Sequence, residues 1–297
     1  MRIAIFGKSE NDWGLEGTVS RELNKNKRNM EFLDINAFNM GSPFTQEYDA
    51  LVFIQGRRIW RELLYGYKGK KVLWNTEFWP YWGKQDNQEA LVRLNLVEPL
   101  EDFNLILNGC PLSTKFLNDK RNVNVEWFPM FGVSKDFYDR IEGVEKSVDI
   151  GFFGHPSSRR IGFWNKLISE SSKSMKRPLK IVWRKVYGKS LVEFINSCRI
   201  ILNIHYTELL NTESRIYETL ACGTYCLSEE LSYPDLFLGG VHLGVASIEN
   251  ISKIAIDMVM EDYPFDVVAH RGYEFVHENF NTAKVLDLLE EKIARLV

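Results

Sequence analysis

The chain has 297 residues, of which 45% are hydrophobic and 26% charged, and its formal net charge is −3. This composition is typical of a globular protein large enough for two domains. Basic and acidic residues are spread evenly over the two halves, so neither half has the excess positive charge of a nucleic-acid-binding domain. No apolar run approaches the roughly 18 residues of a membrane span, and the amino terminus lacks a signal-peptide pattern, so we expect a cytoplasmic protein.

The first half alternates short apolar runs with helical or loop segments. Strands of an open parallel sheet have this rhythm, because a helix must cross between successive strands. The predicted strands are Arg2–Phe6, Glu31–Ile35, Ala50–Gln55, Lys71–Asn75 and Phe103–Leu107.

The loop after the first strand excludes two nucleotide-binding classes. Gly7-Lys8-Ser9 lacks the earlier glycine of a phosphate-binding loop, which argues against a P-loop kinase. A Gly-x-Gly-x-x-Gly fingerprint is also absent, which argues against a dinucleotide-dependent oxidoreductase.

A basic and aromatic stretch, Gly56–Lys71, follows the third predicted strand. It interleaves six arginines and lysines with Trp60, Tyr65 and Tyr67. Such a pattern is typical either of a surface that binds a polyanion or of a solvated helix face, and the sequence leaves both interpretations open.

Glu77 is the candidate catalytic carboxylate. It falls just past the carboxyl end of the predicted strand Lys71–Asn75, which is where open parallel sheets bind ligands. Trp79 and Trp82 lie beside it and are candidates to stack on an acceptor. The alternatives are that Glu77 caps a turn or forms an ion pair, and that the tryptophans pack in a core.

A second series of strands begins at Val148, after a polar stretch, Val133–Ser147, that we interpret as a linker. The last two segments, Val267–Phe280 and Thr282–Leu296, have helical periodicity. The four cysteines lie mostly in apolar segments and predict reduced core thiols. The strands of this series are Val148–Phe153, Lys180–Trp183, Arg199–Ile204, Thr224–Ser228 and Val241–Val245.

The segment Gly151–Arg160 is a candidate phosphate site at the first strand-to-helix turn of this series. Gly154 permits close approach of the backbone to a ligand, and Ser157 or Ser158 can cap the following helix. Arg159 or Arg160 can supply positive charge, and the sequence does not decide between them. Both arginines could equally be solvated helix residues.

The stretch Asn211–Glu230 predicts a site for a nucleotide diphosphate. Ser214 is the predicted N-cap of a short helix that Gly223 ends, and Arg215 and Glu218 lie three residues apart on one face of it. A guanidinium and helix amides can bind phosphate, and a carboxylate can accept from ribose hydroxyls. An ordinary salt pair on a helix surface is the alternative.

This stretch resembles the donor-binding helix of GT-B glycosyltransferases, with the match at Arg215, Glu218, Ala221 and Gly223. The spore-maturation-protein-B-like glycosyltransferases and the bacteriophage DNA beta-glucosyltransferases are the most similar groups. The phage enzymes also have a glycine-then-arginine segment that is similar to Gly154–Arg160. Their catalytic carboxylate lies in a Thr-Asp-x-x-x-Pro turn, and Thr76-Glu77-Phe78-Trp79-Pro80 resembles it with Glu for Asp and one residue fewer.

The resemblance implies an α/β fold of GT-B architecture, in which two Rossmann-like domains with parallel sheets face an interdomain cleft. Residues 1–135 would be the acceptor domain and 146–280 the nucleotide-sugar domain, with 281–297 a terminal helix that crosses back to the first domain. The implied donor is a UDP-sugar, bound by Arg215, Glu218, Gly154, Arg159 or Arg160, and by Asn211 and Ser214. The acceptor would be a hydroxyl group, on a glycan or on DNA with hydroxymethylated bases.

We expect no metal and no cofactor beyond the nucleotide-sugar substrate, because an Asp-x-Asp motif is absent from the sequence and arginines and helix amides can stabilise a diphosphate leaving group. Leu210 occupies the position of the first glutamate of a retaining Glu-x7-Glu motif, which weakens the retaining alternative and leaves both stereochemical outcomes open. In an inverting reaction Glu77 would be the general base. Two other functions remain open: a GT-B epimerase acting on the same nucleotide-sugar, and a sensor that binds it without turnover.

Overall fold

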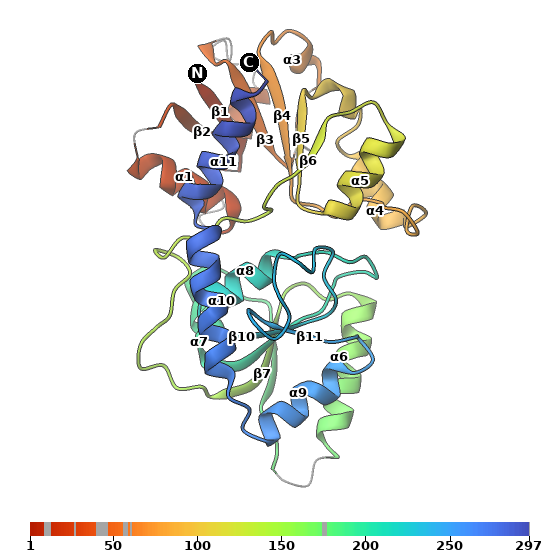
Figure 1. Cartoon of the computed structure of the whole chain (residues 1–297), viewed down its shortest axis with the longest axis vertical. Helices are drawn as coiled ribbons and strands as arrows, with labels where there is room; N and C mark the ends of the chain where they lie inside the picture. The colour runs from red at the N-terminus through yellow and green to blue at the C-terminus, as the bar shows by residue number, and fades with distance from the viewer. Residues whose placement is uncertain are drawn as a thin grey trace. The chain divides into compact units, whose positions relative to one another are not determined.

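The computed structural model describes residues 1–8, 13–26, 28–39, 47–55, 59, 61–173 and 177–296. The chain divides into two compact units, shown in Figure 1. The first unit comprises Met1–Gly132 and Asn281–Val297, and the second comprises Val133–Phe280. Each unit contains one parallel sheet with helices, so the predicted α/β class with two Rossmann-like units is confirmed.

The sheet of the first unit has the strand order β2-β1-β3-β4-β5-β6, and every neighbouring pair is parallel. All five residues of β1 and of β3 are buried, because helices cover both faces of the sheet. Strand β6 was not predicted, since its three residues are too few for a recognisable apolar pattern. The strands are β1 (Ile3–Gly7), β2 (Met30–Asp34), β3 (Ala50–Ile54), β4 (Lys70–Asn75), β5 (Leu105–Asn108) and β6 (Val125–Trp127).

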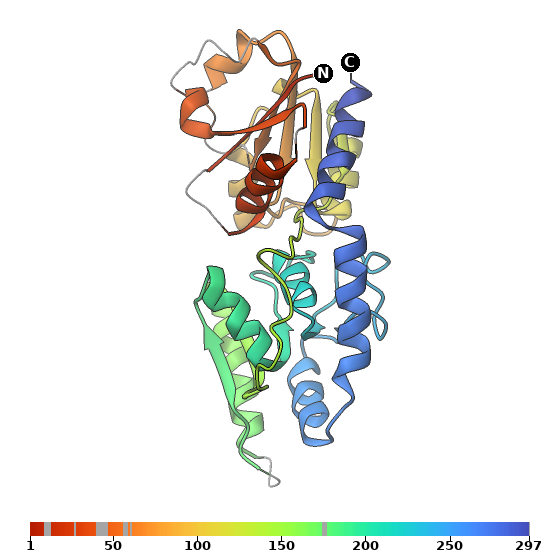
Figure 2. The same cartoon turned by 90° about the vertical axis from the view of Figure 1, so that its left-hand side faces the viewer.

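Helices alternate with these strands along the chain, as right-handed crossovers between parallel strands require. Figure 2 shows helices on both faces of the sheet. They are α1 (Leu15–Lys25), α2 (Ile35–Asn39), α3 (Arg61–Tyr65), α4 (Gln88–Asn95), the 3₁₀ turn η2 (Leu100–Asp102) and α5 (Pro111–Lys120).

The last helix, α11 (Thr282–Ala294), packs within the first unit although it follows the whole second unit in sequence. Leu286, Leu289 and Ile293 are fully buried there, which agrees with the helical periodicity of this segment. Polar contacts also hold it: Arg28 Nη1 pairs with Asp287 at 2.5 Å, and Lys292 pairs with Glu126.

The sheet of the second unit has the order β11-β10-β9-β7-β8 and is also parallel throughout. The chain after β7 runs first to β8 and then back past β7 to β9, so the carboxyl ends of β7 and β9 lie at a point where the strand order reverses. Open parallel sheets bind ligands at such a point. The strands are β7 (Val148–Phe153), β8 (Ile181–Arg184), β9 (Cys198–Asn203), β10 (Tyr225–Ser228) and β11 (Gly244–Val245).

Helices α6 and α9 contact each other, and their apolar residues share a core with β7, β9 and β10. Helix α8 packs against α10. The stretch Val133–Ser147, interpreted above as a linker, belongs to the second unit, where Tyr138 is fully buried and Asn196 Oδ1 accepts from the amide of Ile141 at 2.9 Å. The helices are α6 (Ser158–Ser171), α7 (Gly188–Ser197), α8 (Ser214–Ala221), α9 (Ile251–Met260) and α10 (Phe265–Asn279).

All four cysteines are buried and free, in agreement with core thiols. Across the part of the chain that the structure describes, every helix is too short or too polar to cross a membrane.

The packing of α11 can be tested by truncating one buried leucine. Leu289→Ala should lower the stability of the first unit by about 2–5 kcal/mol, because the side chain is fully buried and its removal leaves a cavity. Leu96→Ala, at a site that is 51% exposed, is the control and should change the midpoint of thermal unfolding little. Equal effects of the two variants would show that α11 is not docked as described.

Candidate nucleotide-binding site

The candidate site lies at the carboxyl ends of β7 and β9 and at the amino ends of α6 and α8. Strand β7 ends at Phe153, and Gly154 then turns the chain with φ = +130°, a conformation that only glycine adopts easily. A Cβ atom on Gly154 would come within 2.7 Å of Arg215 Nη2. Glycine is therefore required here for a reason beyond conformation, because it lets a guanidinium lie against the backbone.

Arg215 is 5% exposed and is fixed at three points. Its Nε donates to the carbonyl of Phe153 at 2.8 Å, and its Nη1 donates to Asn203 Oδ1 at 2.7 Å and to Glu213 Oε2 at 2.8 Å. Its guanidinium carbon also lies 4.6 Å from the centre of the Phe152 ring. Nη2 makes no hydrogen bond to any described residue, so it is the nitrogen left to bind a ligand.

Arg160 is 4% exposed and lies in the same cluster. Its Nε donates to the carbonyl of Ile204 at 2.8 Å, and its Nη2 donates to both carboxylate oxygens of Glu213, at 3.1 and 2.9 Å. Burial lowers the pKa of Arg160 to about 10, against the opposing effect of Glu213, so it remains charged at neutral pH. The Oγ of Ser157 caps α6 by accepting from the amide of Arg160 at 3.2 Å, as predicted.

Glu213 joins the two arginines. Burial alone would raise the pKa of its carboxyl group, but Arg215, the nearby His205 and Arg160 hold that pKa well below its usual range. Nδ1 of His205 lies 3.6 Å from Glu213 Oε1. Glu213 is thus ionised at neutral pH and neutralises one of two buried positive charges, which leaves the cluster with net positive charge.

Glu218, one helical turn beyond Arg215, is 8% exposed. Burial raises its pKa to about 7, while hydrogen bonds from Tyr138 and Ser214 and the charge of Arg215 act in the other direction. The hydroxyl of Tyr138 donates to Glu218 Oε1 at 3.1 Å. The prediction that Ser214 is the N-cap of α8 was wrong: Glu213 is the cap residue, and Ser214 lies inside the first turn and bonds to Glu218.

Arg159 and Arg160, which the sequence could not separate, have different environments. Arg159 donates to both carboxylate oxygens of Glu229, at 2.7 and 2.6 Å, and together with His205 it lines a cavity of about 390 Å³ beside the cluster. Arg160 contacts the same carboxylate as Arg215. Asn211 is 7% exposed, and its Oδ1 accepts from the amide of Thr212 at 2.9 Å, so it holds the turn before α8.

In the first unit, Glu77 follows β4, as expected. Its carboxylate, 17% exposed, pairs with Nη1 of Arg93, whose Nη2 donates to Glu89 at 3.1 Å. The side chain of Asn75 both donates to the carbonyl and accepts from the amide of Glu77, at 2.8 and 3.1 Å. The carboxylate is therefore held in one position, an arrangement compatible with a structural ion pair as well as with catalysis.

The two tryptophans near Glu77, Trp79 and Trp82, differ in their exposure to solvent. Trp79 is 1% exposed and belongs to the hydrophobic core of the first unit, so its predicted role as an acceptor-stacking residue does not fit the structure. Trp82 is 47% exposed, its Nε1 donates to Asp119 at 3.2 Å, and its ring packs edge-on against Phe116. Of the basic stretch Gly56–Lys71, residues 56–58 and Trp60 lie outside the described residues.

Sequence reasoning missed Glu213, Asn203 and Tyr138. Asn203 had a signal, because a polar residue ends an otherwise apolar strand run. Glu213 and Tyr138 had none, because their roles depend on contacts between segments far apart in sequence. Among the described residues there is no group of three or more His, Cys, Asp or Glu side chains placed to hold a metal ion.

Part of the chain matches a known protein family, and the whole chain resembles solved structures in fold. Residues 152–291 match a protein family described as glycosyl transferase-like. No curated protein matches the sequence. Among solved structures, sucrose-phosphate synthase from Thermosynechococcus elongatus superposes with a TM-score of 0.72 at 10% identity, over 100% of this chain and 99% of that one.

Two further structures were solved with UDP and a sugar. Anabaena HepE in complex with UDP and glucose has a TM-score of 0.67 at 11% identity, over 99% of this chain and 100% of that one. The pneumococcal O-GlcNAc transferase GtfA in complex with UDP and GlcNAc has a TM-score of 0.61 at 10% identity, over 88% of this chain and 59% of that one. The fold is that of the GT-B glycosyltransferases.

Removing the charge of Glu213 should destabilise the second unit. Glu213→Gln should cost about 3–5 kcal/mol of stability, because two buried guanidiniums then lack their counter-ion. Glu193→Gln is the matched control, since Glu193 pairs with Lys189 on the surface, and such pairs contribute about 0–1 kcal/mol. The measurement is thermal or urea unfolding of both variants.

The same loss should depend on pH. Because the folded pKa of Glu213 is depressed, its contribution is present above the ordinary glutamate pKa of about 4.3 and declines as the pH falls below that value. The stability difference between wild type and Glu213→Gln should therefore shrink in acid. A difference that stays constant down to low pH would contradict the assigned role of Glu213.

Proposed function

We propose that this protein transfers a sugar from a UDP-sugar donor to a hydroxyl group of an acceptor. The observation that carries the proposal is the pair of buried guanidiniums, Arg160 and Arg215, held by Glu213 at the point where the second sheet reverses its strand order. A diphosphate suits this cluster because its charge complements the net positive charge there. The UDP complexes of HepE and GtfA, which share the fold, support UDP as the nucleotide.

The diphosphate would bind at Nη2 of Arg215 and at the amino end of α6, where Ser157 and Gly154 bring the backbone close. Glu218 would accept hydrogen bonds from the ribose hydroxyls in its ionised form. The cavity beside Arg159 would take the sugar, because the carboxylates of Glu208, Glu229 and Glu230 line it and can accept from sugar hydroxyls.

In the proposed reaction, the acceptor oxygen attacks the anomeric carbon while the bond from that carbon to the diphosphate oxygen breaks. The acceptor proton passes to the carboxylate of Glu77, and UDP leaves with the electron pair of the broken bond. Attack on the face opposite the leaving group inverts the anomeric configuration. Arg160 and Arg215 would stabilise the negative charge of the departing UDP without a metal, in the role that metal ions or arginine clamps have in other phosphate sites.

For the acceptor we propose a glycan, with Trp82 as the stacking residue. The evenly distributed charge of the chain favours a neutral acceptor over a polyanion such as DNA with hydroxymethylated bases. The exposed ring of Trp82 next to Asp119 combines an apolar face with a polar group, as sugar-binding surfaces do.

Donor binding should depend on pH through Glu218. Because the pKa of its carboxyl group is about 7, the affinity for UDP-glucose should rise as the pH increases through neutrality and the stronger, ionised acceptor forms. The diphosphate diester of UDP-glucose has no group that titrates in this range. The measurement is isothermal titration calorimetry at several pH values.

Two variants test whether the pH dependence of donor binding comes from Glu218. Glu218→Gln should bind more weakly and lose the pH dependence, whereas the surface variant Glu193→Gln should keep it. If Glu218→Gln binds UDP-glucose with unchanged affinity and pH profile, Glu218 does not contact the ribose.

The role of Glu77 can be separated from its ion pair with Arg93. Glu77→Gln should retain UDP-glucose binding but release UDP at least about a hundredfold more slowly, since a general base contributes roughly 10²–10⁴-fold. Glu89→Gln removes the other carboxylate that bonds to Arg93 and should leave the rate nearly unchanged. Hydrolysis of UDP-glucose, with water as acceptor, provides the assay.

Equal rates for Glu77→Gln and wild type would show that Glu77 has only its structural ion pair. Formation of a second UDP-sugar from the donor alone would instead identify an epimerase. Binding without turnover by any acceptor or by water would identify a sensor.

A further inference from the structure

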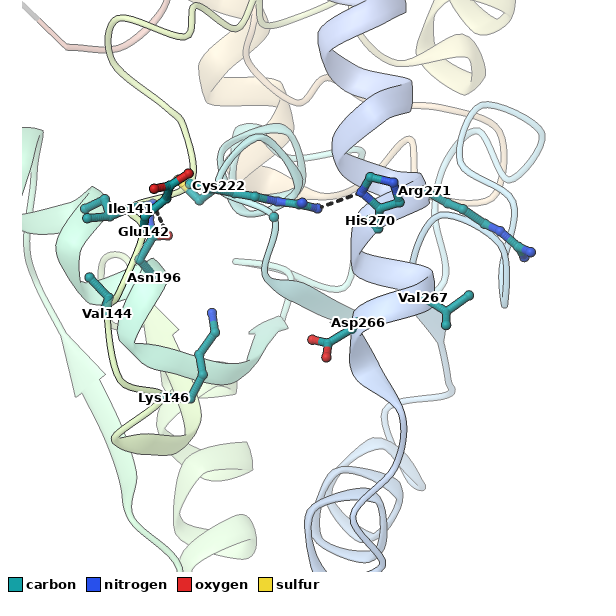
Figure 3. Close-up of a pocket in the computed structure, with 12 residues that line it drawn as sticks. Ile141, Glu142, Val144, Lys146, Asn196, Cys222, Asp266, Val267, His270 and Arg271 are labelled. Carbon is teal, nitrogen blue, oxygen red and sulfur yellow. Dashed lines mark hydrogen bonds between the residues drawn. The ribbon is translucent and has the colours of Figure 1, made fainter.

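A second cavity, of about 620 Å³, lies within the second unit at the opposite end of α8 from Arg215 and Glu218. It is bounded by the stretch before β7, the end of α7, the turn between α8 and β10, and the first two turns of α10 (Figure 3). Neither the donor site nor the proposed reaction uses any of its residues. Its lining combines charged groups with the side chains of Ile141, Val144 and Val267.

Two cations, Lys146 and Arg140, and two carboxylates, Glu142 and Asp266, line this cavity. The ammonium of Lys146 points into it (Figure 3) and donates to the hydroxyl of the buried Thr224 at 3.1 Å. The guanidinium of Arg140 bonds to Nδ1 of His270 at 3.2 Å and lies 4.2 Å from the centre of the Tyr273 ring. Within the described parts of the chain, neither cation forms an ion pair with a carboxylate.

The electrostatics of Lys146 agree with this geometry. Burial lowers the pKa of its ammonium, and the nearby charge of Arg140 lowers it further, while Asp266 on α10 acts in the opposite direction. Glu142 also lines the cavity and Arg271 points away from it in Figure 3. Two like charges that line one cavity repel each other, and an anion between them would remove that repulsion.

We propose that this cavity binds the phosphate group of a small phosphorylated metabolite, between Arg140 and Lys146. A phosphate monoester carries close to two negative charges at neutral pH and three acceptor oxygens, which complements two cationic donors. The apolar side chains of Ile141, Val144 and Val267 would contact the carbon part of the ligand. The proposal does not depend on the proposed sugar transfer, because the cavity shares no residue with the donor site.

The test uses phenyl phosphate as the probe and the full-length protein saturated with UDP, so that the donor site is occupied. Calorimetry should show binding of phenyl phosphate and none of phenol, which lacks the phosphate. Lys146→Met and Arg140→Gln should each weaken binding by about tenfold or more, since each removes charge-assisted hydrogen bonds. Lys189→Gln, at an exposed lysine of the same unit, is the control and should bind like wild type.

Asp266→Asn is a further variant, chosen because its expected effect cannot result from misfolding. It removes a carboxylate that faces the same cavity, so it should tighten binding, and a folding defect cannot produce that gain. The proposal is overturned if wild type does not bind phenyl phosphate, if UDP competes with it, or if Lys146→Met binds as wild type does.

Discussion

The ion cluster around Glu213 is the interaction on which the candidate site depends. Two guanidiniums lie nearly buried within hydrogen-bond distance of one carboxylate, and without it both would be buried charges that lack a counter-ion. Other hydrogen bonds to the two arginines come from groups at the strand ends. The acceptors are the carbonyls of Phe153 and Ile204 and the side chain of Asn203. The cluster therefore fixes the position of both arginines without a ligand, which would lower the entropic cost of binding the proposed diphosphate.

The fold brings these groups together from distant parts of the sequence. Strand β7 is followed by Gly154 and α6, and β9 ends at Asn203, before the turn that leads into α8. All of these lie at the carboxyl edge of the same sheet, because parallel strands have their carboxyl ends on one side. A glycine at position 154 completes the arrangement, since any side chain there would displace Arg215. The same backbone positions thus shape the fold and the candidate site, so the site tolerates little change in its backbone.

The sequence predicted the regular elements better than the contacts between them. The strands of both sheets except β6, and the helices α10 and α11, could be predicted because their apolar residues follow the periods of strands and helices. Arg215, Glu218 and Gly154 could be selected from their local pattern, and all three meet at one site. Glu213 and Tyr138 could not, because a carboxylate that neutralises a distant arginine has no local signature. Trp79 shows the converse: its place next to Glu77 suggested a ligand contact, but its ring fills the core.

The most direct test of this account is a crystal structure of the full-length protein with UDP. The account predicts diphosphate oxygens within hydrogen-bond distance of Arg215 Nη2, ribose hydroxyls at the carboxylate of Glu218, and Glu213 still bridging both arginines. UDP bound at another place, or a cluster in which Glu213 has left Arg160 and Arg215, would contradict it.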